Sequence, residues 1–332
     1  MSIAYPTSQE RIQNKINMFE DIANDLGIHM DVLDSEATTL KFTNGKVHRL
    51  VYGFSFGING SGETRVCIDK SATASILEKE KIPHVPHSKI SRGKTKEISW
   101  PRIKAFAAEQ KQPFNIVAKP LYGKAGIGVT HARGEKELET MTDGLFRKMK
   151  EISLSPFYSI EDEYRVIVLN HGIEYVMRKE KRYVVGDGIS TVGHLISLSR
   201  HKSHTLSDVV LNQIPALNQK VYITWKHNGF TVHRIPIDSK DPLQIKIREL
   251  ASRATKALAM AFCCVDIIKI EADDQPIVLE VNSDVWVESH EVGYDDAKRT
   301  YTKVVAQLVG KQGGCCTYVQ RLFQKYVPLA FS

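Results

Sequence analysis

The chain has 332 residues, of which 42% are hydrophobic and 25% charged, as is ordinary for a globular protein with two or three compact units. No stretch approaches the roughly 18 apolar residues of a membrane helix, and the N-terminal 30 residues lack a secretory apolar core, so we expect a cytoplasmic protein. The formal net charge of +7 suits an anionic ligand, and the basic residues are spread along the chain apart from "RKEKR" at 178–182. Such a charge could attract nucleic acid, but a nucleotide or acidic substrate explains it equally well and is the partner we expect.

The first third of the chain contains both helical and strand-like patterns. Apolar residues recur at helical spacing over residues 7–26 and predict a helix there. Three short strands and a further helix are expected at 29–33, 38–43, 47–52 and 62–80. The second helix must stop before "KIPHVP", because its two prolines cannot continue a helix.

The remaining two thirds alternate between the same two kinds of pattern. Helices are expected at 99–110, 135–151 and 244–262, and the C-terminal region is again mostly helical. Strands are expected at 114–119, 161–169, 173–179, 221–226, 230–235, 265–270 and 276–281. The tripeptide "NHG" between two of these strands predicts a tight hairpin turn. This order predicts an α+β fold with mixed, largely antiparallel sheets.

The five cysteines show no metal-binding or redox spacing. They are a single residue, Cys67, and two adjacent pairs, Cys263 with Cys264 and Cys315 with Cys316. Adjacent cysteines rarely form a disulfide with each other, and no C-x-x-C motif occurs. We therefore expect reduced, mostly buried thiols.

A glycine-rich loop, G-K-A-G-I-G at 123–128, directly follows an apolar strand. It has neither the spacing of a Walker loop nor that of a dinucleotide-binding fold. Its backbone N–H groups could approach phosphate oxygens without an intervening Cβ, and Lys119 and Lys124 add positive charge. A flexible hairpin without a ligand explains the same pattern.

The segment "VDIIKIEADDQPIVLEVNSD" at 265–284 predicts a cation site. In a simple hairpin, Asp266 lies opposite Glu280, and the alternation of strand side chains places Asn282 on the face of Glu280. Two carboxylates and an amide oxygen are hard ligands that suit Mg²⁺ bound to phosphate oxygens. A solvated sheet edge is the alternative, but the apolar neighbours favour a buried hairpin.

Two further polar segments are open to more than one interpretation. In "EDEYRVIVL", Glu163 could accept hydrogen bonds from ribose hydroxyls, or it could form a salt bridge with Arg165. In "WKHNG", Lys226 and Asn228 stand two residues apart at a strand end.

The order of these segments resembles the ATP-grasp ligases, especially the branch with glutathione synthetase and cyanophycin synthetase. The resemblance covers roughly residues 65–300 and is carried by "IDKSATASILEKEKIPHVP", "VAKPLYGKAGIGV", "EYRVIVL", "VVGDGIST" and "VDIIKIEADDQPIVLEVN". It implies the ATP-grasp fold, in which two α+β subdomains clasp ATP. The chain would then divide into a short N-terminal α/β region at 1–68, a lid subdomain with the glycine loop at 69–154, and a C-terminal subdomain with the Mg²⁺-binding hairpin at 155–332.

The resemblance also implies roles for individual residues. Lys70 and Lys119 would contact phosphates, Glu163 would bind ribose, and backbone groups from Leu154 to Phe157 would bind adenine. The lid would consist of Gly123, Lys124, Gly126 and Gly128, and the Mg²⁺ ligands would be Asp266, Glu280 and Asn282. We add Arg178 and Arg182 as candidates for the acyl phosphate, and Lys226 with Asn228 for the phosphates or a second metal ion.

The expected activity is that of an ATP-dependent carboxylate–amine ligase that forms an amide through an acyl phosphate, acting on an amino acid or small peptide. Its cofactors would be ATP and Mg²⁺, with two ions expected, and a homo-oligomer is left open. Two alternatives share the ATP-grasp architecture. One is a phosphotransferase that stops at phosphorylation, and the other is a nucleotide-binding regulatory protein without turnover.

Overall fold

β-Branched and aromatic residues dominate residues 160–179 and 262–282, and these segments form the central sheet of the protein. The computed structural model describes residues 8–93, 99–123, 126–199, 206–227, 232–271, 273–286 and 293–311. The central sheet has the strand order β12-β9-β8-β13-β14 and is antiparallel throughout. Its strands are β8 (Ile160–Leu169), β9 (Gly172–Lys179), β12 (Val232–Ile235), β13 (Phe262–Ile270) and β14 (Asp273–Asn282).

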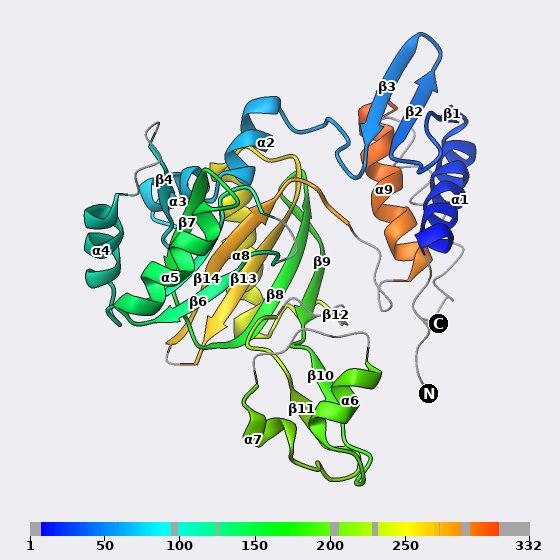
Figure 1. The fold of residues 1–332 in the computed structure, drawn as a ribbon. Coiled ribbons are helices and arrows are strands. Elements are labelled where there is room, and N and C mark those ends of the chain that lie inside the picture. Colours follow the sequence, from blue (N-terminus) through cyan, green and yellow to red (C-terminus); the bar gives the residue numbers. More distant parts are fainter. Residues whose placement is uncertain are drawn as a thin grey trace.

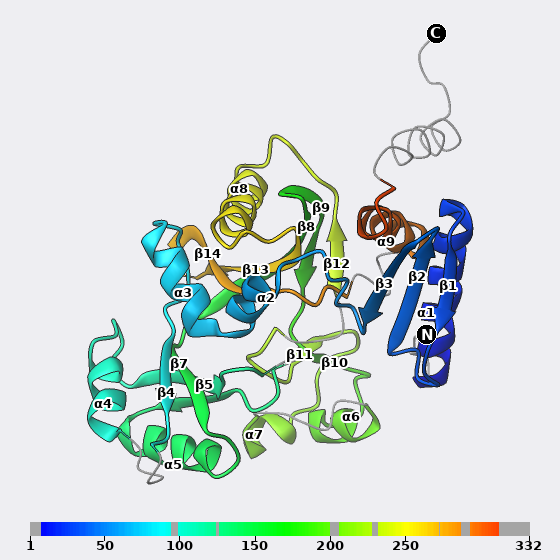
Figure 2. The same ribbon diagram turned by 90° about the horizontal axis from the view of Figure 1, so that it is seen from above.

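One face of the central sheet packs against α8 (Pro242–Ala257), and we call this the back face (Figures 1 and 2). Strand residues such as Tyr164 and Val166 share a core there with Ile247 and Leu250 of α8. The turn between β8 and β9 is tight because Asn170 and His171 both adopt a positive φ, of 49° and 65°. The predicted hairpin is therefore confirmed.

The opposite, front face is partly covered by an N-terminal unit. This unit contains α1 (Ser8–Leu26), β1 (His29–Val32), β2 (Thr39–Asn44) and β3 (Val47–Tyr52), and it packs against α9 (Tyr294–Leu308) (Figure 1). Phe19 of α1 lies 5.3 Å from Tyr301 of α9 between ring centroids, and Phe56 lies 5.9 Å from Phe262 of the central sheet. Lys298 of α9 also forms an ion pair of 2.7 Å with Asp25. The first and last described elements thus share one apolar core with the sheet.

A second, four-stranded antiparallel sheet has the order β4-β7-β5-β6 and forms the lid unit (Figure 2). Its strands are β4 (Ser88–Ser91), β5 (Asn115–Pro120), β6 (Thr130–Arg133) and β7 (Glu151–Pro156), and its helices are α4 (Trp100–Ala108) and α5 (Glu135–Phe146). The boundary proposed between residues 154 and 155 falls within β7, whose residues up to Pro156 still pair in this sheet.

Two smaller parts complete the described chain. Helices α2 (Ser61–Ile68) and α3 (Lys70–Lys79) pack near β14. An insertion after β9 contains β10 (Tyr183–Val185), α6 (Val192–Leu198), α7 (Asp208–Leu211) and β11 (Lys220–Tyr222), and it has a small core of its own. The α+β class with largely antiparallel sheets is as predicted.

Three predicted helices have different boundaries. The helix at 62–80 is two helices, because the Asp69 carboxylate accepts the N–H groups of Ser71 and Ala72 and caps a new helix. The helix at 135–151 ends at Phe146, and the helix at 244–262 ends at Ala257. In both cases the next four residues form a turn, in which Ala259 after the second helix has a positive φ of 51°, and a strand begins only at Glu151 and Phe262. The strand predicted at 221–226 is also shorter, since β11 ends at Tyr222.

Cys67, Cys263 and Cys264 are buried free thiols, as predicted, whereas Cys315 and Cys316 lie outside the described residues. No helix in the described ranges combines the length and the apolar character needed to cross a membrane.

The shared core of the N-terminal unit should contribute to the stability of the whole protein. Phe19 is fully buried among Phe42, Phe56 and Tyr301, so Phe19→Ala should lower the free energy of unfolding by about 3–5 kcal/mol. Urea denaturation measures this change. The neighbouring Glu20→Ala removes an exposed side chain and should change the free energy by less than about 0.5 kcal/mol. Equal effects of the two variants would contradict the packing described.

Candidate functional site

Charged side chains gather on the front face of the central sheet, beyond the part that the N-terminal unit covers. They come from four adjacent strands: Glu163 and Arg165 from β8, Lys179 from β9, Asp266 from β13, and Glu280 with Asn282 from β14. The strand register brings them together, because Glu163 is opposite Lys179 and Asp266 is opposite both Arg165 and Glu280. The sequence-based pairing of Asp266 with Glu280 is confirmed.

Asp266 is fully buried and is held by two cations. Arg165 binds it through two hydrogen bonds, from Nε to Oδ1 and from Nη2 to Oδ2, both 2.8 Å long, and Lys179 Nζ lies 2.9 Å from Oδ2. Burial alone would raise the pKa of Asp266, but Arg165 and Lys179 outweigh it and hold the pKa below its ordinary value. Asp266 therefore carries a stable negative charge inside the sheet.

Lys179 also donates to Glu163, so it bridges two carboxylates. Burial raises the pKa of Glu163, and Lys179 opposes this shift. The salt bridge considered from the sequence thus exists with a different partner, since Glu163 pairs with Lys179 and Arg165 pairs with Asp266. The ribose-binding role of Glu163 stays a prediction.

Glu280 and Asn282 lie next to this network with fewer bonds. Asn282 Nδ2 lies 3.2 Å from Glu280 Oε1 and 3.4 Å from Asp266 Oδ2. Within the described ranges no ion pair to Glu280 is formed. Of Glu163, Asp266 and Glu280, Glu280 is the one whose carboxylate has no direct contact with a lysine or arginine of the described residues.

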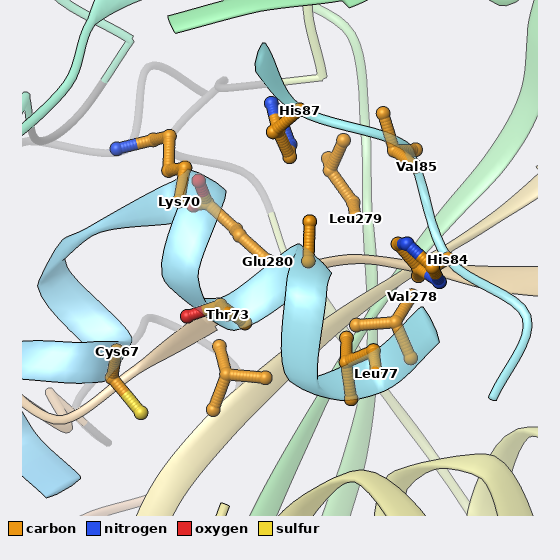
Figure 3. A pocket seen from close by; sticks show the side chains of 12 residues that line it. Cys67, Lys70, Thr73, Leu77, His84, Val85, His87, Val278, Leu279 and Glu280 are labelled. Atoms are coloured by element: carbon orange, nitrogen blue, oxygen red, sulfur yellow. The ribbon is translucent and has the colours of Figure 1, made fainter. Parts of the chain in front are cut away.

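Two buried lysines approach Glu280 from other elements. Lys70 is the first residue of α3 and Lys119 lies on β5 of the lid sheet. Burial lowers the pKa of Lys119 to about 8 and also lowers that of Lys70, while the Glu280 charge opposes both shifts. Figure 3 shows the Glu280 side chain beside Lys70 at the start of α3. Two buried lysines from outside the central sheet thus lie near one carboxylate of its front face.

The glycine loop is tied to this group at its base. Lys70 Nζ donates to the carbonyl oxygens of Leu121 and Gly123, each at 3.2 Å. Gly126 and Gly128 have positive φ values of 69° and 72°, where a side chain would be strained. The loop glycines are therefore required by the backbone, while Lys124 lies outside the described residues.

Residue His87 also belongs to this region, and sequence reasoning missed it. With Lys70, Thr73 and Glu280 it lines a cavity of about 10 Å³, room for roughly one water molecule (Figure 3). His87 Nδ1 is 3.0 Å from Ser153 Oγ, whereas Nε2 is shielded from solvent and has no hydrogen-bond partner among the described residues. Burial, with Lys119 and Lys70 nearby, holds the pKa of His87 well below its ordinary value, so the imidazole is neutral. The sequence offers no signal for it beyond a histidine near two prolines.

Two predicted site residues lie elsewhere. Arg178 points to the back face, where it binds Asp162 through Nε at 2.7 Å, because side chains alternate along β9 and Lys179 takes the front face. Leu154 lies in a central strand between β4 and β5, so its backbone groups are used by the sheet and its side chain by the lid core. Arg178 thus lies on the other face from these charged residues, and the backbone of Leu154 is paired within the sheet, while the roles expected for both residues stay predictions.

The remaining predicted residues lie at the edge of the lid. Lys226 Nζ donates to the Val129 carbonyl at 2.6 Å, and Arg182 is close enough to contribute to lowering the pKa of Lys226. The Phe157 ring stacks on His131 at 4.0 Å and meets Trp225 edge-on at 5.6 Å. Asn228 lies outside the described residues.

Mg²⁺ prefers hard oxygen ligands, and the Glu280 carboxylate and the Asn282 amide are neighbours on β14 that offer them. Both residues therefore fit a Mg²⁺ site. In the described residues no group of three or more His, Cys, Asp or Glu side chains is arranged to hold a metal ion.

Two α+β units with a glycine loop between them, facing a carboxylate-bearing antiparallel hairpin, define the ATP-grasp fold. A bifunctional glutathione synthetase structure from Pasteurella multocida shares it with a TM-score of 0.52 and 20% identity, covering 90% of this chain and 44% of that one. A D-alanine–D-alanine ligase from Bacillus anthracis shares it with a TM-score of 0.51 and 15% identity, covering 80% and 72%.

Sequence comparison gives the same class. The chain is 25% identical over 320 residues to the glutathione biosynthesis bifunctional protein GshAB of Pasteurella multocida, covering 85% of this chain and 41% of that protein. It is 24% identical over 246 residues to the cyanophycin synthetase of a Nostoc species, covering 65% and 26%. These relatives are ATP-grasp ligases, so the resemblance found in the sequence is confirmed. The chain spans about two fifths of the length of the GshAB proteins it matches, and no family model matches it.

Because the pKa of Lys119 is lowered, we expect nucleotide affinity to depend on pH. Below about pH 8 Lys119 is charged and attracts phosphate, whereas above pH 8 it must regain a proton, so nucleotide affinity should fall as the pH rises through this value. Calorimetric titration of a non-hydrolysable ATP analogue between pH 7 and 9.5 measures the effect. Lys119→Arg, whose side chain stays charged, should bind with little change over this interval. The same fall in Lys119→Arg would show that another group is responsible.

Proposed function

We propose that the chain is an ATP-dependent carboxylate–amine ligase that forms an amide bond on an amino acid or small peptide. The proposal rests on one observation: two lysines lie near the Glu280 carboxylate and its neighbour Asn282, and one of these lysines, Lys70, binds the carbonyl of Gly123 at the base of the glycine loop. The relatives support it, since their names include glutathione biosynthesis and cyanophycin synthesis and a structural neighbour is a D-alanine–D-alanine ligase.

In the proposed reaction the substrate carboxylate attacks the γ-phosphorus of ATP. The bond from that phosphorus to the β–γ bridging oxygen breaks, which gives an acyl phosphate and ADP. The amine then attacks the acyl carbon, phosphate leaves, and loss of a proton from nitrogen completes the amide. Neither step needs an oxidant or reductant.

Residues of this chain would neutralise the phosphate charge and exclude water during these steps. Lys70 and Lys119 would neutralise the phosphates from the side of α3 and the lid sheet. Glu280 and Asn282 would hold Mg²⁺, which supplies further charge neutralisation when bound. The glycine loop, anchored by Lys70, would close over the phosphates and keep water from the acyl phosphate. The buried free cysteines of the described chain support the cytoplasmic location that is part of this proposal.

An assay of ADP and phosphate release with a panel of amino acids and small peptides tests the proposal. We expect release that needs both a carboxylate and an amine substrate, with an amide product visible by mass spectrometry. Release with a carboxylate or hydroxyl acceptor alone, giving a stable phosphorylated product, would replace the ligase with a phosphotransferase. ATP binding without turnover across the panel would replace it with a regulatory protein.

We expect the rate of ADP release to depend on the negative charge of Glu280. Glu280→Gln keeps the shape and removes the charge that faces both lysines, so ADP release should fall by about 10²–10³-fold. Steady-state kinetics under saturating ATP measure this loss. The matched control is Glu249→Gln on the exposed side of α8, which should keep its rate within about twofold. A Glu280→Gln enzyme as fast as the control would remove Glu280 from the reaction.

A further inference from the structure

A polar network of three side chains lies between the lid sheet and the start of α3, and the reaction proposed above gives it no role. Lys89 of β4 stands at its centre, with Nζ 2.8 Å from Glu151 Oε1 on β7 and 3.7 Å from Asp69 Oδ2. The exposed fractions of these three side chains are 33%, 28% and 20%, so water and salt screen the two ion pairs only in part. Lys89 thus joins the lid sheet to the residue that precedes α3.

The Asp69 carboxylate also fixes the start of α3, whose first residue is Lys70. Its Oδ1 accepts hydrogen bonds from the backbone N–H groups of Ser71 at 3.0 Å and Ala72 at 3.1 Å, as an N-cap does. Its Oδ2 is the oxygen that lies toward Lys89. One carboxylate therefore holds both the helix that carries Lys70 and a lysine of the lid sheet.

The Glu151 end of the network contacts the base of the glycine loop, which we define as residues 121–123. The backbone N–H of Leu121 donates to the backbone carbonyl oxygen of Glu151 at 3.5 Å. Lys89 Nζ lies 6.0 Å from the centroid of the Tyr122 ring, at the outer limit of a cation–π contact. Lys89 is the largest cause that lowers the pKa of Glu151, and hydrogen bonding by Tyr122 adds to it. The loop base is thus in contact with both members of the ion pair.

Lys70 holds the same loop base from the side of α3. Its Nζ donates to the carbonyl oxygens of Leu121 and Gly123, which stand on either side of Tyr122. These two bonds form only while the start of α3 and the loop base keep their separation, and Lys89 is attached to both. Ion pairs with this much exposure add little to the stability of a fold. A displacement of about 1 Å near a reacting group, in contrast, can lower a rate by about 10²-fold.

We propose that Lys89 is a positioning residue that places the glycine loop against Lys70, with Asp69 and Glu151 as its two anchors. The inference rests on the proposed function, because its effect is on the loop that would keep water from the acyl phosphate.

Displacement of the loop has a defined chemical result. Water adds to the acyl carbon of the acyl phosphate, and the bond from this carbon to the phosphate oxygen breaks. The products are the free carboxylate and phosphate, and the protons of water pass to the solvent. ADP has then been formed without an amide.

The ratio of ADP to amide, measured in the same reaction mixture, tests the role of Lys89. In Lys89→Met and in Glu151→Gln we expect this ratio to rise at least about threefold above that of the wild type. Lys89→Arg keeps the charge and the reach to both carboxylates, so it should retain the ratio of the wild type. A variant that is only less folded would lose ADP and amide in proportion and would leave the ratio unchanged.

The matched control is Glu135→Gln, which removes the charge of another glutamate in the lid unit. Glu135 of α5 lies 2.6 Å from Lys104 of α4, in an ion pair between these two helices. This variant should keep the ratio within about 1.5-fold of the wild type. An unchanged ratio in Lys89→Met and Glu151→Gln, or an equal rise in Glu135→Gln, would overturn the inference.

Failure of the proposed function gives a different result. A wild-type chain that binds or cleaves ATP without forming any amide would overturn the proposed function, and the position of the loop is then measured by binding. Calorimetric titration with a non-hydrolysable ATP analogue should show at least about threefold weaker binding for Lys89→Met and no loss for Glu135→Gln. Equal affinities of these two variants would overturn the role of Lys89.

Discussion

The ion pair between Arg165 and Asp266 is the constraint on which the front face depends. Two charges can stay in the interior of a sheet only while they remain bonded to each other, and here both hydrogen bonds are 2.8 Å long. The pair links β8 to β13 in one register, and a slip of one residue would turn every side chain of a strand to the other face. The position of Glu280 on β14 and of Lys179 on β9 follows from this register.

Two of the positive charges at the site come from outside the central sheet. The carboxylates belong to the central sheet, whereas Lys70 comes from α3 and Lys119 from the lid sheet, and Lys70 also binds the backbone at the base of the glycine loop. In the proposed function, a phosphate chain between the two sheets would meet lysines held outside the central sheet and carboxylates held within it.

Sequence reasoning was strongest where a hairpin fixed the geometry. The midpoint of the turn placed Asp266 opposite Glu280, and the same reasoning about "NHG" places Lys179 opposite Glu163. The basic cluster was instead treated as a unit, which favoured Arg178 although alternation turns it to the back face. The ends of the helices expected at 135–151 and 244–262 differ because no glycine or proline marks them: both helices end in turns of ordinary helix-forming residues, one of them with Ala259 at a positive φ of 51°. His87 lines the cavity because β7 of one sheet and β14 of the other both pack against it. A sequence pattern within a single segment cannot predict such contacts.

The contact between α1 and α9 also affects the order in which the chain folds. Phe19 and Asp25 near the beginning of the chain find their partners, Tyr301 and Lys298, almost 300 residues later. During synthesis on the ribosome, the first helix emerges long before the helix that covers it. The side of α1 that packs on α9 therefore stays uncovered until α9 has been synthesised.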